Sequence, residues 1–250
     1  MSLANDYRRQ AQWRDWTTAF SLLPEVSGKR VLDIGCAIGD QTAELARRGA
    51  SVVGVDINPD LLKMARSRGI ANAELVAELP SPSSSPFDGI WSSFAPAYFV
   101  DLSVALQEWR SLLAPGGFIA LVEVDDLFAH EPLAEESARI LSAFADDAAA
   151  ARRYDFRMGR WLRPCLEECG FTVTVDRTLA DAELAFDGPA APDVLEAWQS
   201  RFDRLRGLHA FAGARYEAVR DDFLACLQHP AHRSAARVCM CVGTLANREP

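Results

Sequence analysis

Short apolar runs alternate with amphipathic segments through the first half of the chain, a rhythm typical of repeated βαβ units. Between the runs, apolar residues recur at helical spacing, and glycine or proline marks where these segments end. The pattern predicts a mainly parallel sheet with helices on both faces. The expected strands occupy residues 30–34, 51–56, 73–77, 87–92 and 117–124.

The rhythm changes after Val124, where longer helical stretches interrupt the alternation. Residues 132–151 and 193–228 carry apolar side chains at helical spacing. Two further strands are expected at 171–176 and 237–245. The sequence therefore predicts an α/β fold with a doubly wound, seven-stranded sheet, in one domain over residues 1–250.

Composition excludes several classes of protein. Hydrophobic residues make up 49% of the 250-residue chain, enough for a core with layers on both faces of a sheet. No stretch approaches the roughly 18 apolar residues of a membrane span, and the first residues are polar where a secretory signal would be apolar. We therefore expect a cytoplasmic protein with no membrane partner.

Charge and cysteine spacing add further expectations. The net charge is −9, without a long Lys/Arg run, so binding of nucleic acid is not expected and a small molecule fits better. Six cysteines lie scattered without a CxxC pair and are interpreted as reduced, mostly buried thiols, with no metal expected. A four-thiolate site remains the lesser alternative; its ligands would be Cys165, Cys169, Cys239 and Cys241. A homodimer stays open.

The segment VLDIGCAIG at 31–39 predicts a ligand site, because a strand turns there through small residues directly into a helix. The carboxyl edge of a parallel sheet is where doubly wound folds bind ligands. Gly35 would form the tight turn, Ala37 would allow close approach, and Gly39 would lead into the helix. Cys36 lies in the same turn, and the carboxylate of Asp33 could attract an ammonium group.

A dinucleotide-binding turn is the alternative interpretation of this segment. The pattern GxGxxG needs a small residue at position 40, but the chain has Asp40, which would also repel a pyrophosphate. An NAD(P)-type oxidoreductase is therefore the less favoured hypothesis.

VLDIGCAIG resembles motif I of the class I S-adenosylmethionine-dependent methyltransferases, and the later elements follow a similar order. The resemblance implies the Rossmann-like methyltransferase fold and S-adenosylmethionine as cofactor, with S-adenosylhomocysteine as product. It covers 29–121 motif by motif and continues more loosely through GRWLRPCLEECGF to the final strand.

The resemblance also implies roles for individual residues. Asp56 would bind both ribose hydroxyls, and Ile57 would lie against the adenine. The family often has an acid after the third strand, but ELVAELP is shortened there, so Glu78 or the backbone at Ala77 would take its place. The loop after the fourth strand would pass beside the methionine and the methyl group, through Ser92, Ser93 and Phe94.

Several further residues are open to a functional or a structural interpretation. Tyr7, Trp13 and Trp16 are expected on one helix before the first strand. By resemblance that helix closes over the cofactor, with Tyr7 and Arg14 at the methionine end and Trp13 at the substrate; plain core packing is the alternative. Tyr98 and Phe99 either line the acceptor pocket or anchor their loop. His130 is the candidate general base, or an exposed loop histidine.

The inserted helical segments need a role, because about 60 residues separate the last two strands. We expect 1–28 to form an N-terminal helical cap, 29–126 the cofactor-binding core, and 127–170 with 177–236 a lid over a small acceptor. The hypothesis is methyl transfer by in-line displacement. A catalytically silent, methyltransferase-like binding module is the alternative from another class.

Overall fold

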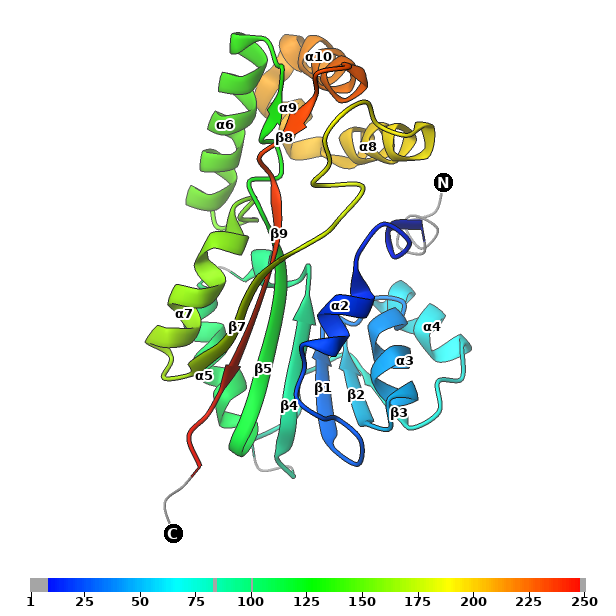
Figure 1. Ribbon diagram of the computed structural model, residues 1–250, viewed down its shortest axis with the longest axis vertical. Helices are drawn as coiled ribbons and strands as arrows, with labels where there is room; N and C mark the ends of the chain where they lie inside the picture. Colours follow the sequence, from blue (N-terminus) through cyan, green and yellow to red (C-terminus); the bar gives the residue numbers. More distant parts are fainter. Residues whose placement is uncertain (1–8, 83–84, 100, 248–250) are drawn as a thin grey trace.

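Seven strands form one central sheet in the computed structural model, which describes residues 9–82, 85–99 and 101–247 (Figure 1). The order across the sheet is β3-β2-β1-β4-β5-β9-β7. The first five strands run parallel, and β9 lies antiparallel between β5 and β7, which confirms the predicted fold. The strands are β1 (Arg30–Ile34), β2 (Ser51–Val55), β3 (Ala73–Val76), β4 (Phe87–Ser93), β5 (Leu113–Asp125), β7 (Thr172–Leu179) and β9 (Arg237–Thr244).

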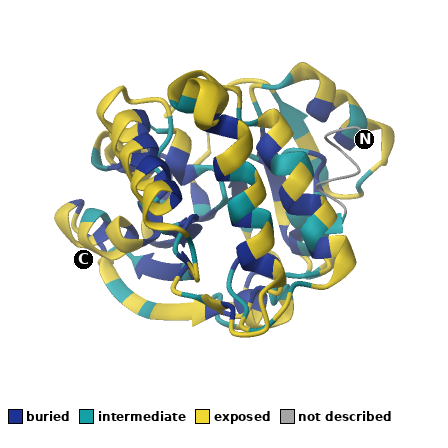
Figure 2. Cartoon of the chain, turned by 90° about the horizontal axis from the view of Figure 1, so that it is seen from above, coloured by how far each residue is buried: buried dark blue, intermediate teal, exposed yellow. Residues whose placement is uncertain are grey.

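Helices cover both faces of the sheet, and each face has its own apolar core. Because side chains alternate along a strand, Val31 of β1 contributes to one core and Leu32 to the other. Figure 2 shows helices with buried residues on one side and exposed residues on the opposite side. The first core includes residues of α2 (Trp16–Ser21) and α3 (Asp40–Arg47); the second includes residues of α5 (Leu102–Ser111) and α7 (Leu162–Glu168).

The fifth strand begins earlier than the sequence predicts. The sequence predicts a strand at 117–124, but α5 already ends at Ser111 and β5 begins at Leu113. Leu113 pairs with Phe87, and the register then shifts so that Gly89 pairs with Phe118. The chain bulges between these pairs, where Gly116 has a φ of 73°. A bulge absorbs residues that sequence patterns assign to a turn.

The helical stretch expected at 193–228 is divided into three helices. They are α8 (Pro192–Arg204), α9 (Arg206–Ala212) and α10 (Tyr216–Gln228), with a short 3-10 turn before α10. Gly213, with a φ of 54°, accounts for the second break. Together with α6 (Glu135–Ala150), these helices lie beyond the carboxyl ends of β5 and β7 (Figure 1). We call this group of four helices the helical cap; it does not include the N-terminal segment.

The single N-terminal helix expected through Trp13 and Trp16 is wrong for the described residues. The chain turns at 11–13, Arg14 forms an isolated bridge with Asp181, and α2 starts only at Trp16. The reason is local: the side chain of Asp15 accepts a hydrogen bond from Thr18 N, which caps a new helix. Tyr7 lies outside the described residues.

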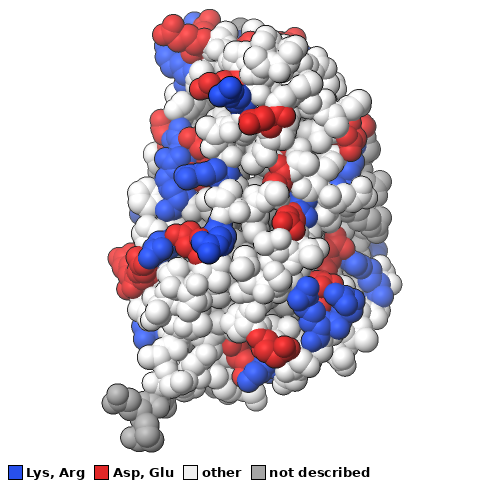
Figure 3. Space-filling model, in the orientation of Figure 1, with Lys and Arg blue, Asp and Glu red and all other residues white. Residues whose placement is uncertain are grey.

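No helix within the described ranges is long and apolar enough to span a membrane. On the face drawn in Figure 3, acidic and basic side chains are interspersed, and neither sign forms a continuous band. The same described residues contain no group of three or more histidine, cysteine or acidic side chains that could hold a metal ion.

Candidate functional site

The turn after β1 is held in the left-handed region at three positions. Gly35, Ala37 and Gly39 have φ values of 79°, 45° and 80°. A Cβ added to Gly35 would lie 2.4 Å from the Cβ of Ala95, so the turn at Gly35 has no room for a side chain. Ala37 is the only one of the three with a side chain, and its Cβ strains the left-handed backbone.

Asp56 fastens this turn to the loop after β2. Its two carboxylate oxygens accept hydrogen bonds at 2.8 Å from the backbone nitrogens of Ala37 and Asn58. Each carboxylate oxygen has a second lone pair, so these bonds leave acceptor capacity for hydroxyl groups. Asp56, which is predicted to bind the ribose, therefore lies directly against the predicted turn.

Asp33 lies beneath the turn and is only 2% exposed. Thr42 Oγ1 of α3 donates to its Oδ2 at 2.5 Å. Burial raises the pKa of Asp33 to about 7, the Thr42 hydrogen bond opposes this rise, and the charge of Asp56 adds to it. Burial, with the nearby charges of Asp33 and Asp56, also raises the pKa of Cys36, which packs as a neutral thiol.

The predicted adenine-binding residues lie at the ends of β2 and β3. Ile57 is 91% exposed, so its side chain is accessible to a ligand. Ala77 and Glu78 directly follow β3 and are both exposed. All three are accessible at the same edge of the sheet.

The predicted residues at the end of β4 are placed differently from one another. Ser92 is fully buried, and its hydroxyl donates to Ile34 O at 3.0 Å, so it joins β4 to β1. Ser93 and Phe94 are partly exposed, and Phe94 adopts a left-handed φ of 52°. The ring of Phe94 lies under the Arg14 guanidinium, with Cζ 4.3 Å from the ring centroid.

Arg14 belongs to a buried ion network between the N-terminal segment and the segment after β7. Its guanidinium lies 3.4 Å from Asp181 and 3.3 Å from Glu183, and Glu183 also pairs with Arg201 of α8. Backbone hydrogen bonds reinforce this junction, from Asp15 N to Ala180 O and from Ala182 N to Trp13 O. The charge of Arg14 is thus engaged by the chain itself.

Among the predicted substrate residues, Tyr98 and Phe99 have different surroundings. Phe99 packs edge-on against Trp109 of α5, with ring centroids 4.8 Å apart, as expected for an anchor of the loop. Tyr98 is 65% exposed and meets Tyr154 edge-on at 4.8 Å. Trp13 is partly buried against the core at the junction of the N-terminal segment.

His130 lies inside the helical cap and not among the predicted cofactor residues. It is 3% exposed, so the exposed-loop interpretation is wrong. His232 Nδ1 lies 2.8 Å from Gly188 O and must donate there, which makes its Nε2 the acceptor for His130 Nδ1 at 3.0 Å. Burial and the neighbouring His232 lower the pKa of His130 to about 3, which makes it a weak base at neutral pH.

Glu123 is a candidate functional residue that the sequence analysis missed. It lies near the end of β5 with no exposed surface, and its oxygens accept hydrogen bonds from Val124 N and from Ala97 N in the loop after Phe94. Burial raises its pKa to about 7, against the two backbone hydrogen bonds and the charge of Arg14. The sequence does contain a signal, because Glu123 and Asp125 are acids at the end of an otherwise apolar strand.

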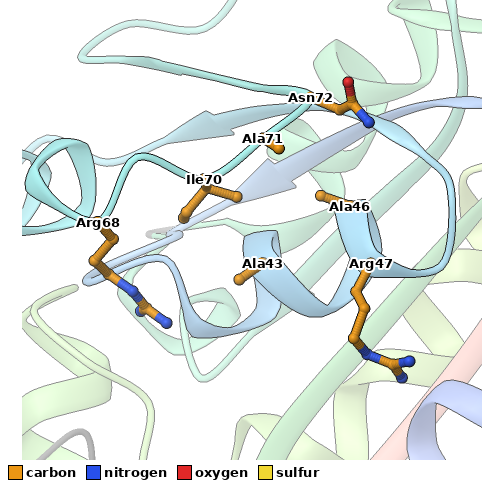
Figure 4. Close-up of a pocket in the computed structure, with 7 residues that line it drawn as sticks. All are labelled: Ala43, Ala46, Arg47, Arg68, Ile70, Ala71 and Asn72. Carbon is orange, nitrogen blue, oxygen red and sulfur yellow. The ribbon is translucent and has the colours of Figure 1, made fainter.

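A cavity of about 330 Å³ lies between α3 and the segment at 68–72 (Figure 4). None of the predicted site residues lines it. Its lining consists of Ala43, Ala46, Arg47, Arg68, Ile70, Ala71 and Asn72. Arg68 donates to Ile38 O and Asp40 Oδ1, both at 2.6 Å, and so braces the turn from behind.

The carboxyl edge fits an adenosyl cofactor better than a dinucleotide. Asp56 makes no ion pair among the described residues and keeps acceptor capacity at this edge, and a carboxylate suits hydroxyl groups while repelling a pyrophosphate. Asp33 is buried beneath the turn, so the structure does not expose it to an ammonium group. Because there is no room for a side chain at Gly35, no side chain covers the backbone at that position of the turn. Asp56 and the exposed Ile57 follow β2 directly at this edge.

This sheet order, with a glycine-containing turn after β1 and an acid after β2, defines a class I S-adenosylmethionine-dependent methyltransferase. The model of a methyltransferase domain family matches residues 6–175, and the chain belongs to that family. The oxidoreductase alternative is therefore wrong. A demethylmenaquinone methyltransferase from Tropheryma whipplei (strain Twist) is 28% identical over 204 residues, which cover 74% of this chain and 82% of the relative.

Two solved structures share the fold. A methyltransferase from Haloferax volcanii, solved in complex with the Trm112 methyltransferase activator, has a TM-score of 0.60 at 18% identity, with 98% of this chain and 95% of that chain covered. A geranyl diphosphate C-methyltransferase from Streptomyces coelicolor A3(2), solved with S-adenosylhomocysteine, Mg²⁺ and geranyl diphosphate, has a TM-score of 0.57 at 14% identity. That match covers 95% of this chain and 81% of the other.

Proposed function

We propose that the chain transfers a methyl group from S-adenosylmethionine to a small-molecule acceptor held between the carboxyl edge of the sheet and the helical cap. The observation that carries the proposal is the junction over this edge. Arg14 and Trp13 of the N-terminal segment are tied to the segment at 180–183 by the ion network and by backbone hydrogen bonds. A site covered in this way suits a small acceptor better than a polymer.

The cofactor would be held by the residues at the ends of β1 and β2. Asp56 would accept hydrogen bonds from the ribose, and Ile57 would cover the adenine. When bound, S-adenosylmethionine supplies a methyl group already activated on a sulfonium for in-line displacement. The chain then needs to position the acceptor, exclude water and accept a proton where the acceptor loses one.

Glu123 is the residue that we assign to proton uptake. Its Oε2 is bonded to Ala97 N, between Phe94 and Tyr98 along the chain, and its pKa of about 7 is suited to exchange at neutral pH. Because Glu123 has no exposed surface, an acceptor hydroxyl could pass its proton to this carboxylate only when the loop at 94–98 moves aside. A hydroxyl would lose the proton as its oxygen bonds to the methyl carbon, whereas an ammonium would have to lose a proton before its nitrogen could attack.

Small-molecule chemistry is also supported by the names of similar proteins. The relative from Tropheryma whipplei is named for demethylmenaquinone, and the structure from Streptomyces coelicolor holds geranyl diphosphate. Demethylmenaquinone and geranyl diphosphate are both small molecules but differ in chemistry, so a test of activity needs a panel of acceptors.

Isothermal titration calorimetry with S-adenosylmethionine and S-adenosylhomocysteine tests the cofactor site directly. In the Asp56→Ala variant we expect affinity to fall by about 1–3 kcal/mol, or about 5- to 150-fold, because charged hydrogen bonds are lost. The control is Asp60→Ala, which removes an exposed carboxylate from the first turn of α4 (Pro59–Ser67). Unchanged affinity in a folded Asp56→Ala variant would remove Asp56 from the site.

Transfer requires its own measurement, because binding alone would also fit the silent-module alternative. The full chain is incubated with methyl-labelled S-adenosylmethionine and an acceptor panel that includes a demethylmenaquinone analogue. Label in an acceptor supports the proposal. Tight cofactor binding without transfer to any small molecule tested would favour the binding module.

A further inference from the structure

A second cavity opens beside Tyr98, between the loop after β4 and the end of α6. Its volume is about 70 Å³, and its lining includes Tyr98, Arg152, Arg153, Tyr154 and Asp155. A single water needs roughly 10–15 Å³ of such space, so the cavity holds several waters or one charged end group. It is too small for a whole acceptor.

The unengaged charge at this cavity is positive. Arg153 is paired with Asp147, and Asp155 Oδ1 accepts a hydrogen bond from Arg157 N at 2.8 Å. The side chain of Arg152 is exposed and has no ion pair or hydrogen bond within the described ranges. Two arginines therefore line the cavity against one carboxylate.

The backbone at Arg152 adopts a conformation that normally requires glycine. Its φ is 55°, at the position just after the end of α6. The bonds from Arg152 N to Ala149 O and from Arg153 N to Ala148 O complete the helix terminus. Glycine is the usual residue there because a Cβ strains the left-handed backbone. The arginine thus places a charge at the cavity and strains the backbone.

Two tyrosines provide the aromatic part of the same wall. Tyr98 and Tyr154 meet edge-on, with centroids 4.8 Å apart, and Arg201 of α8 interacts electrostatically with both. Phenol hydroxyls donate hydrogen bonds, and their rings pack against other rings. Positive charge, hydroxyl donors and aromatic surface together suit an anionic aromatic group.

We propose that Arg152 and Tyr98 form a subsite for an oxyanion, a carboxylate or a phosphate, carried by the methyl acceptor. The proposal rests on the proposed function, because Tyr98 belongs to the acceptor site there. It narrows the acceptor to small molecules with an anionic end, bound by Arg152 at the mouth while the opposite end lies toward Phe94 and Glu123.

The test is a calorimetric titration of the full chain, saturated with S-adenosylhomocysteine, with phenyl phosphate and with benzoate. We expect saturable binding of at least one probe, and the tighter probe identifies the oxyanion. Phenol is the uncharged control and is expected to bind much more weakly. S-adenosylhomocysteine is also titrated by itself, and the probe titrations are repeated without it. Failure of the cofactor to bind, which refutes the proposed function, is thereby distinguished from failure of the subsite to bind a probe.

Three variants of Arg152 separate charge from backbone strain. Arg152→Gly and Arg152→Asn remove the charge at a position both residues tolerate, and binding should weaken at least about tenfold. Arg152→Lys keeps a charge, and its affinity should lie closer to that of the wild type. Arg152→Gly should also melt about 2–4 °C higher, because the strain is relieved. Absence of binding by both probes, equal binding of phenol, or unchanged affinity in Arg152→Gly overturns the proposal.

Discussion

Because the pKa of Glu123 is raised, the free energy of unfolding should depend on pH. The Glu123→Gln variant measures the part of that dependence that comes from this one carboxyl. The folded-state pKa of this carboxyl is raised from 4.5 to about 7, chiefly by burial. A raised pKa means that the favourable contribution is fully present below pH 4.5 and is lost as the pH rises through 7. At about 1.4 kcal/mol per pH unit, the loss amounts to about 3 kcal/mol.

The Glu123→Gln variant carries an uncharged group of the same shape and therefore resembles the protonated acid at every pH. Loss of one backbone hydrogen bond, at Val124 N or Ala97 N, affects the variant at all pH values by about 1–3 kcal/mol. Relative to the wild type, however, the variant should gain about 3 kcal/mol in the free energy of unfolding between pH 4.5 and pH 8.

Urea denaturation followed by tryptophan fluorescence at several pH values measures this difference. Titration of Asp33 affects both proteins equally and cancels in the comparison. The matched control is Glu108→Gln, at an exposed position of α5, which should follow the wild type across the range. A constant difference between Glu123→Gln and the wild type would show that Glu123 ionises normally, and its assignment to proton uptake would fail.

Three further substitutions test the site and the cap. Gly35→Ala should lower the free energy of unfolding by about 1–3 kcal/mol, because its Cβ meets Ala95 at 2.4 Å and the φ is positive; wild-type urea midpoints would contradict this. Thr42→Val should destabilise the protein by about 1–3 kcal/mol at pH 8 and by less at pH 5, where Asp33 is protonated; equal losses at both values would contradict the assigned pKa. His130→Phe should reduce the loss of stability on acidification, because the pKa of His130 is lowered to about 3 and its stabilisation is lost as the pH falls below 6.5; an unchanged acid profile would exclude His130 as the cause.

The parallel part of the fold was predictable because its signals are local. Apolar runs of strand length and glycine-containing turns are recognised from residues that are neighbours in the chain, and β1 and β2 form as expected. The turn at 35–39 and the acid after β2 were recognisable for the same reason, since the carboxyl ends of parallel strands meet at one edge.

Other features depend on contacts between distant segments and were therefore missed or misassigned. The raised pKa of Glu123 depends on its burial by distant segments, and the hydrogen bond that opposes the rise comes from Ala97 N, 26 residues away along the chain. The engagement of Arg14 depends on Asp181 and Glu183. His130 is buried within the cap by residues distant along the chain, among them His232.

The sequence by itself determined the order of the elements, the glycine-containing turn and the carboxylate that follows the second strand. The tertiary structure decided which charges are neutralised, which acid is left with a pKa near neutrality, and what covers the carboxyl edge. The physical reason is that backbone conformation follows mainly from neighbouring residues, whereas burial and ion pairing arise between segments that only folding brings together.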